Sequence, residues 1–256
     1  MVKKFITVIQ VLLILIFLGC GGYIGKYFYD AHRAQEQFEE IGEIVEENAP
    51  EPDEEGNYVE QYAENGMLLQ YYELYEKNND MCGWLKIPDT VIDYPVVQAA
   101  DNDYYLHRDF YRNNQFSGTP FIDCDCTADS SNLIIYAHNM KNGTMFAAIA
   151  KYESVDFFKA HSQIIYDTLY ERGTYDIISV FRTTVGSENE FRYHYYADIE
   201  TEREFDEYVS KAKALSIHPT DATAVYGDPL ITLSTCAYHT SNERLVIVAR
   251  KSGESL

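Results

Sequence analysis

The chain is predicted to fold mainly as β-structure, in the form of a closed barrel or a sandwich. Eight short β-like runs separated by turn residues lie between positions 83 and 250. The 23 tyrosines and 13 phenylalanines among the 256 residues suit strands, and a hydrophobic content of 46% is enough to bury a core. The sequence shows no internal repeat. One substantial domain with appendages therefore fits this length.

The N-terminal segment is predicted to be a membrane anchor. Residues 5–24 form an apolar run without a charged side chain, about the 20 residues that a helix needs to cross a bilayer. Lys3 and Lys4 precede the run, which favours a cytoplasmic N-terminus and an extracellular remainder. A cleaved signal peptide and a lipoprotein lipidated on Cys20 are the alternatives, and both also place the remainder outside the cytoplasm. We assign residues 1–28 to a cytoplasmic tip and a single-pass anchor.

Residues 29–66 are predicted to be an acidic stalk. Twelve acidic residues and no basic residue lie between Glu36 and Glu64, and such a run repels itself and buries little. Phe38, Ile41 and Val45 recur at helical spacing, which is compatible with a helix in the first half of the stalk. We expect a solvated spacer that holds the folded domain off the membrane. The net charge of −21 also argues against nucleic acid as a partner.

The folded domain is predicted to span residues 67–256 and to contain the eight strands. A turn at 171–173, with the sequence Glu-Arg-Gly, connects the fifth and sixth of them as a hairpin. Each run is short, rich in β-branched and aromatic residues and bounded by turn residues. The predicted strands are residues 83–87, 91–97, 121–123, 132–136, 164–169, 174–184, 230–235 and 245–250.

Three helical segments are predicted within this domain. An N-terminal helix at 67–75 has one apolar face and ends before two asparagines. A second segment covers 144–152. The third, 201–215, begins with the capping box formed by Thr201 and Glu204 and has an apolar face. It lies between the sixth and seventh strands.

A thiol, an imidazole and a guanidinium lie at the ends of three predicted strands. His138 follows one apolar run, Cys236 ends another, and Arg244 precedes the last. A cysteine attacks a carbonyl as its thiolate, which a neighbouring histidine promotes. The same histidine can protonate a leaving amine, and a permanently charged guanidinium suits the oxyanion of the intermediate. The three residues together are the parts of a cysteine acyl-transfer site, and this chemistry needs no cofactor.

Each of these residues also has an ordinary structural interpretation. A single cysteine is more often a small buried side chain than a nucleophile, and His107 and His239 are rival general bases. The odd number of cysteines, five, does not indicate a disulfide framework. The pair Cys124 and Cys126 lacks a second ligand pair at zinc spacing, so we predict no metal site.

Four stretches of the chain resemble a class B sortase, a membrane-anchored cysteine transpeptidase of Gram-positive bacteria. The closest match is TLSTC, which contains Cys236, and YAHNM resembles the histidine motif of the family. Ala137 departs from the glycine that commonly precedes the histidine, and Ala237 stands where some relatives carry a glutamate. The matching stretches are 83–88 with 92–98, 105–110 with 116–123, 136–140 and 232–236, and residues 244–246 fit the arginine strand of the family.

The resemblance implies a closed eight-stranded barrel with an N-terminal helix and a helix between strands six and seven. It also implies that Cys236 cleaves a C-terminal sorting signal after threonine through a thioester. An amine of the peptidoglycan precursor would then receive the secreted protein. Leu106, Ser234 and Thr235 would bind the substrate peptide, and tyrosines 193, 195 and 196 would border its groove.

Two other functions remain as alternatives. A sortase-like surface scaffold without activity would retain the fold, although the three catalytic residue types are present here. An L,D-transpeptidase also uses a cysteine on cell-wall substrates, but its cysteine usually follows a glycine, whereas Thr235 precedes Cys236.

Overall fold

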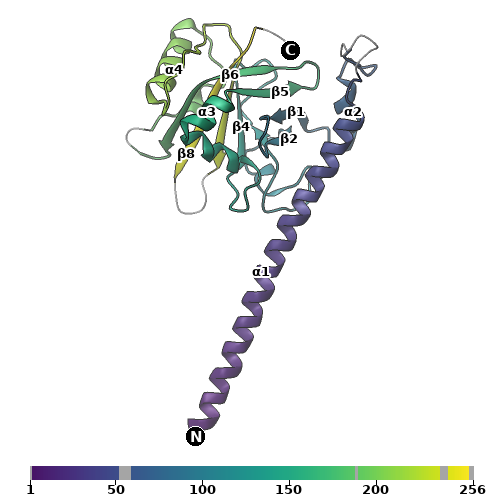
Figure 1. The fold of residues 1–256 in the computed structure, drawn as a ribbon, viewed down its shortest axis with the longest axis vertical. Helices are drawn as coiled ribbons and strands as arrows, with labels where there is room; N and C mark the ends of the chain where they lie inside the picture. Colours follow the sequence, from purple (N-terminus) through teal and green to yellow (C-terminus); the bar gives the residue numbers. More distant parts are fainter. Residues whose placement is uncertain (1, 52–58, 188–189, 237–241, 254–256) are drawn as a thin grey trace.

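The computed structural model describes residues 2–51, 59–187, 190–236 and 242–253, and it consists of a β-barrel with a long helix along one side (Figure 1). Helix α1 (Val2–Glu47) extends well beyond the barrel at its N-terminal end, while its C-terminal part lies beside β1, β2 and α2 (Leu69–Lys77). The other long helix of the described chain, α4 (Glu202–Leu215), lies on the opposite side of the barrel.

Eight strands close into a barrel, which confirms the predicted fold class and excludes a sandwich. Around the barrel the order is β1-β2-β3-β4-β7-β8-β6-β5. The pairs β2–β3 and β4–β7 are parallel and the other pairs are antiparallel. All eight predicted strands are present, with small shifts at their ends. Their bounds are β1 (Met81–Lys86), β2 (Asp93–Val97), β3 (Phe121–Ile122), β4 (Asn132–His138), β5 (Gln163–Thr168), β6 (Thr174–Thr184), β7 (Leu230–Cys236) and β8 (Glu243–Lys251).

Strand β7 is buried on both faces from Leu230 to Thr235, because one face fills the barrel and α4 with the nearby 3₁₀ turn η3 (Tyr193–Tyr195) covers the other. The polar side chains on the covered face are satisfied. The Thr232 hydroxyl lies 2.7 Å from that of Tyr208 on α4 and donates to the Asn132 side chain at 2.8 Å. The Asn132 amide in turn donates to the Tyr196 carbonyl at 3.0 Å. These bonds hold β4, β7 and α4 together.

Helix α4 begins as its sequence predicts. The Thr201 side chain accepts a hydrogen bond from the backbone N–H of Glu204, and its hydroxyl donates to the Glu204 carboxylate. The apolar face predicted for this helix is buried, with the exception of Leu215 at its last turn, which is 42% exposed. The helix packs on β6, where Ser179 donates to the Ala212 carbonyl at 2.6 Å.

The predicted helix at 144–152 is a 3₁₀ helix, η2 (Phe146–Glu153), followed by the short α-helix α3 (Val155–Ala160). Phe146, Ile149 and Tyr152 are fully buried and recur every three residues. This is the period of a 3₁₀ helix, which has three residues per turn, and an α-helix would rotate the third of them away from the core.

Helix α1 crosses the boundary between the predicted anchor and the predicted stalk without a break. It is the one helix of the described residues that is long and apolar enough to span a membrane. Its C-terminal part is not the solvated spacer that the acidic composition predicted. Ala34, Phe38 and Ile41 are buried, and the Phe38 ring packs at 5.0 Å against that of Tyr94 in β2. The apolar stripe of the stalk therefore docks this helix on the barrel, while its acidic residues face solvent.

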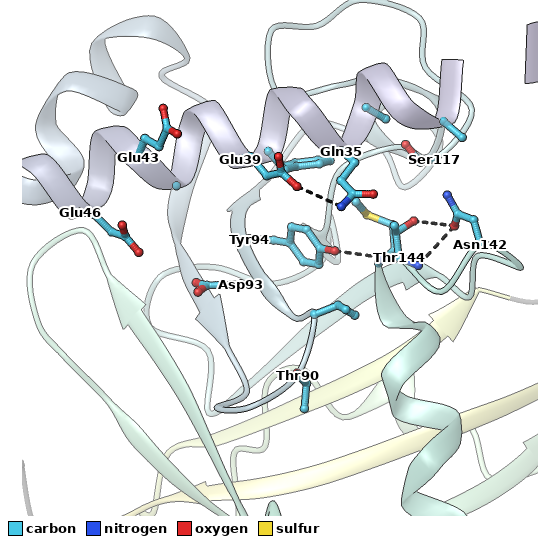
Figure 2. A pocket seen from close by; sticks show the side chains of 16 residues that line it. Gln35, Glu39, Glu43, Glu46, Thr90, Asp93, Tyr94, Ser117, Asn142 and Thr144 are labelled. Carbon is cyan, nitrogen blue, oxygen red and sulfur yellow. Dashed lines mark hydrogen bonds between the residues drawn. The ribbon is translucent and has the colours of Figure 1, made fainter. Parts of the chain in front are cut away.

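A cleft of about 500 Å³ follows the line where α1 meets the barrel (Figure 2). Gln35 and Glu39 of α1 form one wall and are hydrogen-bonded to each other at 3.0 Å. On the opposite wall, the Tyr94 hydroxyl accepts from the Met145 backbone N–H at 3.2 Å. The cleft separates these polar residues of α1 from the barrel, beside the contact that Phe38 makes with Tyr94.

Candidate active site

The barrel brings two of the three predicted catalytic residues to opposite positions of neighbouring strands. Strands β4 and β7 are paired in parallel, and their register joins Asn132 with Leu230 and continues without a shift to His138 with Cys236. The two residues are far apart in the chain. Since parallel strands end at the same edge of a sheet, the histidine and the cysteine meet at one end of the barrel.

Arg244 lies at the same end of the barrel, on the other side of β7. In the antiparallel pair of β7 and β8, Ser234 is opposite Val246, and the Thr235 hydroxyl accepts from the Leu245 backbone N–H at 3.1 Å. If this register is continued by two residues beyond the Ser234–Val246 pair, Arg244 comes level with Cys236. Arg244 is half-buried, and its Nη1 is buried without a hydrogen-bond partner among the described residues.

The imidazole of His138 is held by the segment that enters β3. Its Nε2 lies 2.9 Å from the Leu106 carbonyl oxygen. Because a carbonyl oxygen only accepts hydrogen bonds, Nε2 must carry a proton, and proton exchange falls to Nδ1. The ring is also stacked against two others, His107 at 5.6 Å and Phe116 at 6.4 Å between centroids. These contacts fix both the tautomer and the plane of the imidazole.

Leu106 and Phe116 belong to one loop, residues 105–119, which contains the 3₁₀ turn η1 (Tyr105–His107). Gly118 lies where the two ends of the loop meet, with a φ of +62°. A Cβ at this position would lie 2.6 Å from the carbonyl oxygens of both Tyr105 and Leu106. Only glycine fits here without moving the carbonyl that holds His138.

The structure places the three predicted substrate-binding residues in different environments. Leu106 is half-buried and packs against the core. Ser234 is fully buried, with its hydroxyl 2.6 Å from that of Tyr193, and the Thr235 hydroxyl is hydrogen-bonded to the backbone of β8. Ser234 and Thr235 therefore fix the strand that ends in Cys236. Contact with a peptide stays a prediction for all three.

Of the tyrosines expected to border a groove, Tyr195 alone is well exposed, at 69%. Tyr193 is buried, and the ring of Tyr196 packs at 5.1 Å against that of Tyr208. The rival base His107 is exposed and lies beside His138, whereas His239 lies outside the described residues.

The cysteine-rich stretch before β4 offers one group of possible metal ligands. Ligand atoms of Asp123, Cys124 and Asp125 lie within 4.8 Å of one another. The Asp123 carboxylate already accepts from the Tyr136 hydroxyl at 2.8 Å and from the Asp125 backbone N–H at 3.0 Å. Cys126 is buried separately, and its thiol contacts the Asn132 carbonyl. These bonds account for the geometry of the stretch.

The sequence matches the sortase domain family over residues 85–252. Sortase B of Listeria monocytogenes is 33% identical over 242 residues, which cover 92% of this chain and 91% of that protein. Sortase B of Staphylococcus aureus is 27% identical over 252 residues, 97% of each chain. A crystal structure of sortase B from Bacillus anthracis superposes with a TM-score of 0.75 at 31% identity, covering 89% of this chain and all of that one.

The chain belongs to the sortase family, and the relatives and structures that it resembles are class B sortases. It is thus a cysteine transpeptidase by family, with the closed barrel that the sequence predicted. These comparisons favour neither the inactive scaffold nor the L,D-transpeptidase. The apolar part of α1 is a candidate for the membrane association that is general among sortases.

Proposed function

We propose that Cys236 is the nucleophile, His138 the proton-transfer group and Arg244 the oxyanion-stabilising cation of this transpeptidase. The observation that carries the proposal is the register of three adjoining strands. His138 on β4 is paired with Cys236 on β7, and continuing the β7–β8 register by two residues from the Ser234–Val246 pair would bring Arg244 to the same level. Directly opposite residues of paired strands share a face of the sheet, which supports a common site.

The buried Nη1 of Arg244 supports its assignment. A buried N–H group without an acceptor costs about 1–3 kcal/mol, and more when the group is charged. An enzyme can tolerate this cost in its free form when the missing hydrogen-bond acceptor is supplied by a reaction intermediate. The tetrahedral intermediate of acyl transfer carries an oxyanion, which would accept from this guanidinium.

The reaction proceeds by two exchanges of the acyl group. The Cys236 thiolate forms a bond to the carbonyl carbon of a threonine in the sorting signal, and the C–N bond of the next residue breaks. The leaving amine takes a proton from Nδ1 of His138. An acceptor amine then attacks the thioester and gives its proton back to Nδ1. A new amide forms and the thiolate of Cys236 is regenerated, so no other reactant is needed.

For the whole chain we propose an extracellular catalytic domain, residues 67–256, behind a single-pass anchor in residues 1–28. The natural substrates are secreted proteins with a C-terminal sorting motif, and the acceptor is an amine of a peptidoglycan precursor. The apolar and uncharged run of α1 supports the anchor, and the two lysines before it support a cytoplasmic N-terminus. Tethering beside emerging chains raises the effective concentration of substrate.

The test uses the full chain in detergent micelles with quenched fluorescent peptides of the form x-Pro-x-Thr-x. We expect cleavage after threonine and, with an added lysine or diaminopimelate peptide, a new amide product in mass spectrometry. Cys236→Ala should abolish both products, and Arg244→Ala should lower kcat by roughly 100-fold or more.

The matched control is Cys124→Ala. Cys124 is half-buried and follows β3, outside the three strands that end or begin at His138, Cys236 and Arg244, so this variant should retain wild-type activity. Cleavage that survives Cys236→Ala would show that another residue is the nucleophile. Equal loss in both cysteine variants would point to a folding defect, which circular dichroism would reveal.

A further inference from the structure

The loop 105–119 holds the catalytic imidazole, so whatever holds this loop also affects His138. Inside the loop, the backbone N–H of Gln115 donates to the His107 carbonyl at 2.9 Å, and the Thr119 hydroxyl donates to the Arg108 carbonyl at 3.0 Å. The loop is therefore a compact unit, and a shift of one part carries to the Leu106 carbonyl. Two separate parts of the protein fasten it from outside.

The first attachment is the turn between α2 and β1. The Asn78 amide donates to the Tyr105 hydroxyl at 2.9 Å and to the Phe110 carbonyl at 2.7 Å. The Asp80 carboxylate accepts from the Tyr105 hydroxyl at 2.6 Å and from Arg112 at 3.0 Å. Burial alone would raise the pKa of Asp80, but these two hydrogen bonds lower it below its usual value. This side of the loop is thus fixed within the barrel domain.

The second attachment is helix α1. The Gln37 amide donates to the Asp109 carboxylate at 3.1 Å, and its carbonyl accepts from the Gln115 amide at 3.3 Å. Asp109 is buried and also accepts from the backbone N–H of Asn113. Nearer the apolar run, the ring of Tyr27 contacts that of Phe116 at 6.1 Å. One glutamine of the helix therefore joins both halves of the loop.

We propose that Gln37 is a positioning residue for His138 and that the barrel-proximal part of α1 belongs to the active-site framework. The Gln37 side chain is hydrogen-bonded to that of Gln115, and the Gln115 backbone N–H is hydrogen-bonded to the His107 carbonyl. The adjacent carbonyl, that of Leu106, is hydrogen-bonded to the His138 imidazole. This goes beyond the proposed function and rests on it, since His138 is taken as the proton-transfer group. The segment that the sequence presents as a spacer has a role in catalysis.

A glutamine suits this position because it both donates and accepts. Leucine at position 37 would keep the size of the side chain and remove both hydrogen bonds, which would leave the buried Asp109 carboxylate with one partner fewer. The loop would remain attached to Asn78 and Asp80, so the fold should persist while the Leu106 carbonyl shifts. Displacement of a reacting group by a fraction of an ångström costs roughly tenfold or more in rate.

The experiment compares Gln37→Leu with Gln35→Leu in the full chain in detergent micelles. Gln35 lies two residues earlier on α1 and bonds to Glu39 in the same helix, at the wall of the cleft (Figure 2). We expect Gln37→Leu to lower kcat about tenfold, to leave KM unchanged and to shift the pH profile of kcat. Gln35→Leu should match the wild type. Gln115→Leu should reproduce the effect, and the double variant with Gln37→Leu should be no worse than either single one.

A second measurement does not depend on turnover. In ¹⁵N-histidine-labelled protein, NMR distinguishes a proton on Nε2 from one on Nδ1, and His138→Gln assigns the signal. We expect the Nε2–H form in the wild type and in Gln35→Leu, and a mixture of tautomers in Gln37→Leu.

Equal kcat and equal tautomers in the two glutamine variants would overturn the proposal, as would a loss of activity that follows a loss of Tm. Absence of peptide cleavage by the wild type would instead count against the proposed function, and the tautomer signal would still decide the role of Gln37.

Discussion

Replacement of Gly118 by alanine tests whether the Leu106 carbonyl controls the active site. The new Cβ would lie 2.6 Å from the carbonyl oxygens of Tyr105 and Leu106, whereas ordinary contacts begin at 3.4 Å. Each oxygen would have to move by about 0.8 Å if the loop absorbed the whole overlap. The Leu106 oxygen accepts from His138 at 2.9 Å, so a movement of that size along this bond takes it beyond hydrogen-bonding distance.

The energetic cost has two parts. An alanine at a φ of +62° costs roughly 1–2 kcal/mol relative to its favoured conformations, and the overpacking adds about 1–3 kcal/mol. We therefore expect Gly118→Ala to lower the free energy of unfolding by roughly 2–5 kcal/mol. For a domain of this size, each kcal/mol corresponds to about 2–4 °C in Tm. Because the imidazole loses its hydrogen bond to the Leu106 carbonyl, kcat should fall by roughly 10–100-fold.

The assay is peptide cleavage by the full chain, at a temperature well below the Tm of each variant, together with thermal unfolding by circular dichroism. Gly143→Ala is the matched control, because Gly143 also has a positive φ, +88°, but no atom lies within 4 Å of the position that its Cβ would take. It should lose about 1–2 kcal/mol of stability and keep its activity. Wild-type kcat in Gly118→Ala would refute the role given to the Leu106 carbonyl.

Three further predictions concern the rest of the barrel. Asn132→Ala should lower the free energy of unfolding by about 2–3 kcal/mol in urea denaturation, because the Thr232 hydroxyl on β7 loses its acceptor and the Tyr196 carbonyl loses a donor. A change below about 0.5 kcal/mol would contradict this. Burial raises the pKa of Asp167 above 3.8, so this carboxyl contributes stability at low pH that is lost as pH rises through its folded-state pKa. In urea denaturation from about pH 3.5 to about pH 7, the free energy of unfolding of Asp167→Asn should therefore rise relative to that of the wild type as pH rises. A difference in free energy of unfolding that is independent of pH would count against this prediction. Burial also raises the thiol pKa of Cys82 to about 11 and that of Cys126 to about 12, so iodoacetamide at neutral pH should leave both unlabelled in mass spectrometry, while rapid labelling of either would show that its burial is transient.

The strands and the barrel could be predicted because their signals are local. Short apolar runs bounded by turn residues indicated all eight strands, and the capping residues indicated the start of α4. The 3₁₀ geometry of η2 was harder to predict, because Phe146, Ile149 and Ala150 have spacings of three and four residues that suit an α-helix equally well.

The neighbourhood of His138 and Cys236 could not be derived from spacing, since strand register is decided by tertiary pairing. A family resemblance supplied what the residues alone left open. The hydrogen bond between His138 and Leu106 could not be predicted from the sequence, because Leu106 contributes a backbone carbonyl, which every residue has. The glycine in FSGTP was the nearest indication, and its meaning depends on the carbonyl packed against it.

The docking of α1 on the barrel also determines how far above the membrane surface the barrel of this enzyme would lie. The apolar run ends at residue 24, and the ring of Tyr27 already contacts that of Phe116, which in turn lies against the imidazole of His138. Three residues of helix rise only about 4.5 Å. With the apolar run in a bilayer, the end of the barrel at which His138 and Cys236 are paired would rest at the lipid headgroups instead of standing above them on a stalk. A substrate would then have to present its scissile bond within a few residues of its own membrane segment, so the spacing between motif and tail becomes part of substrate selection.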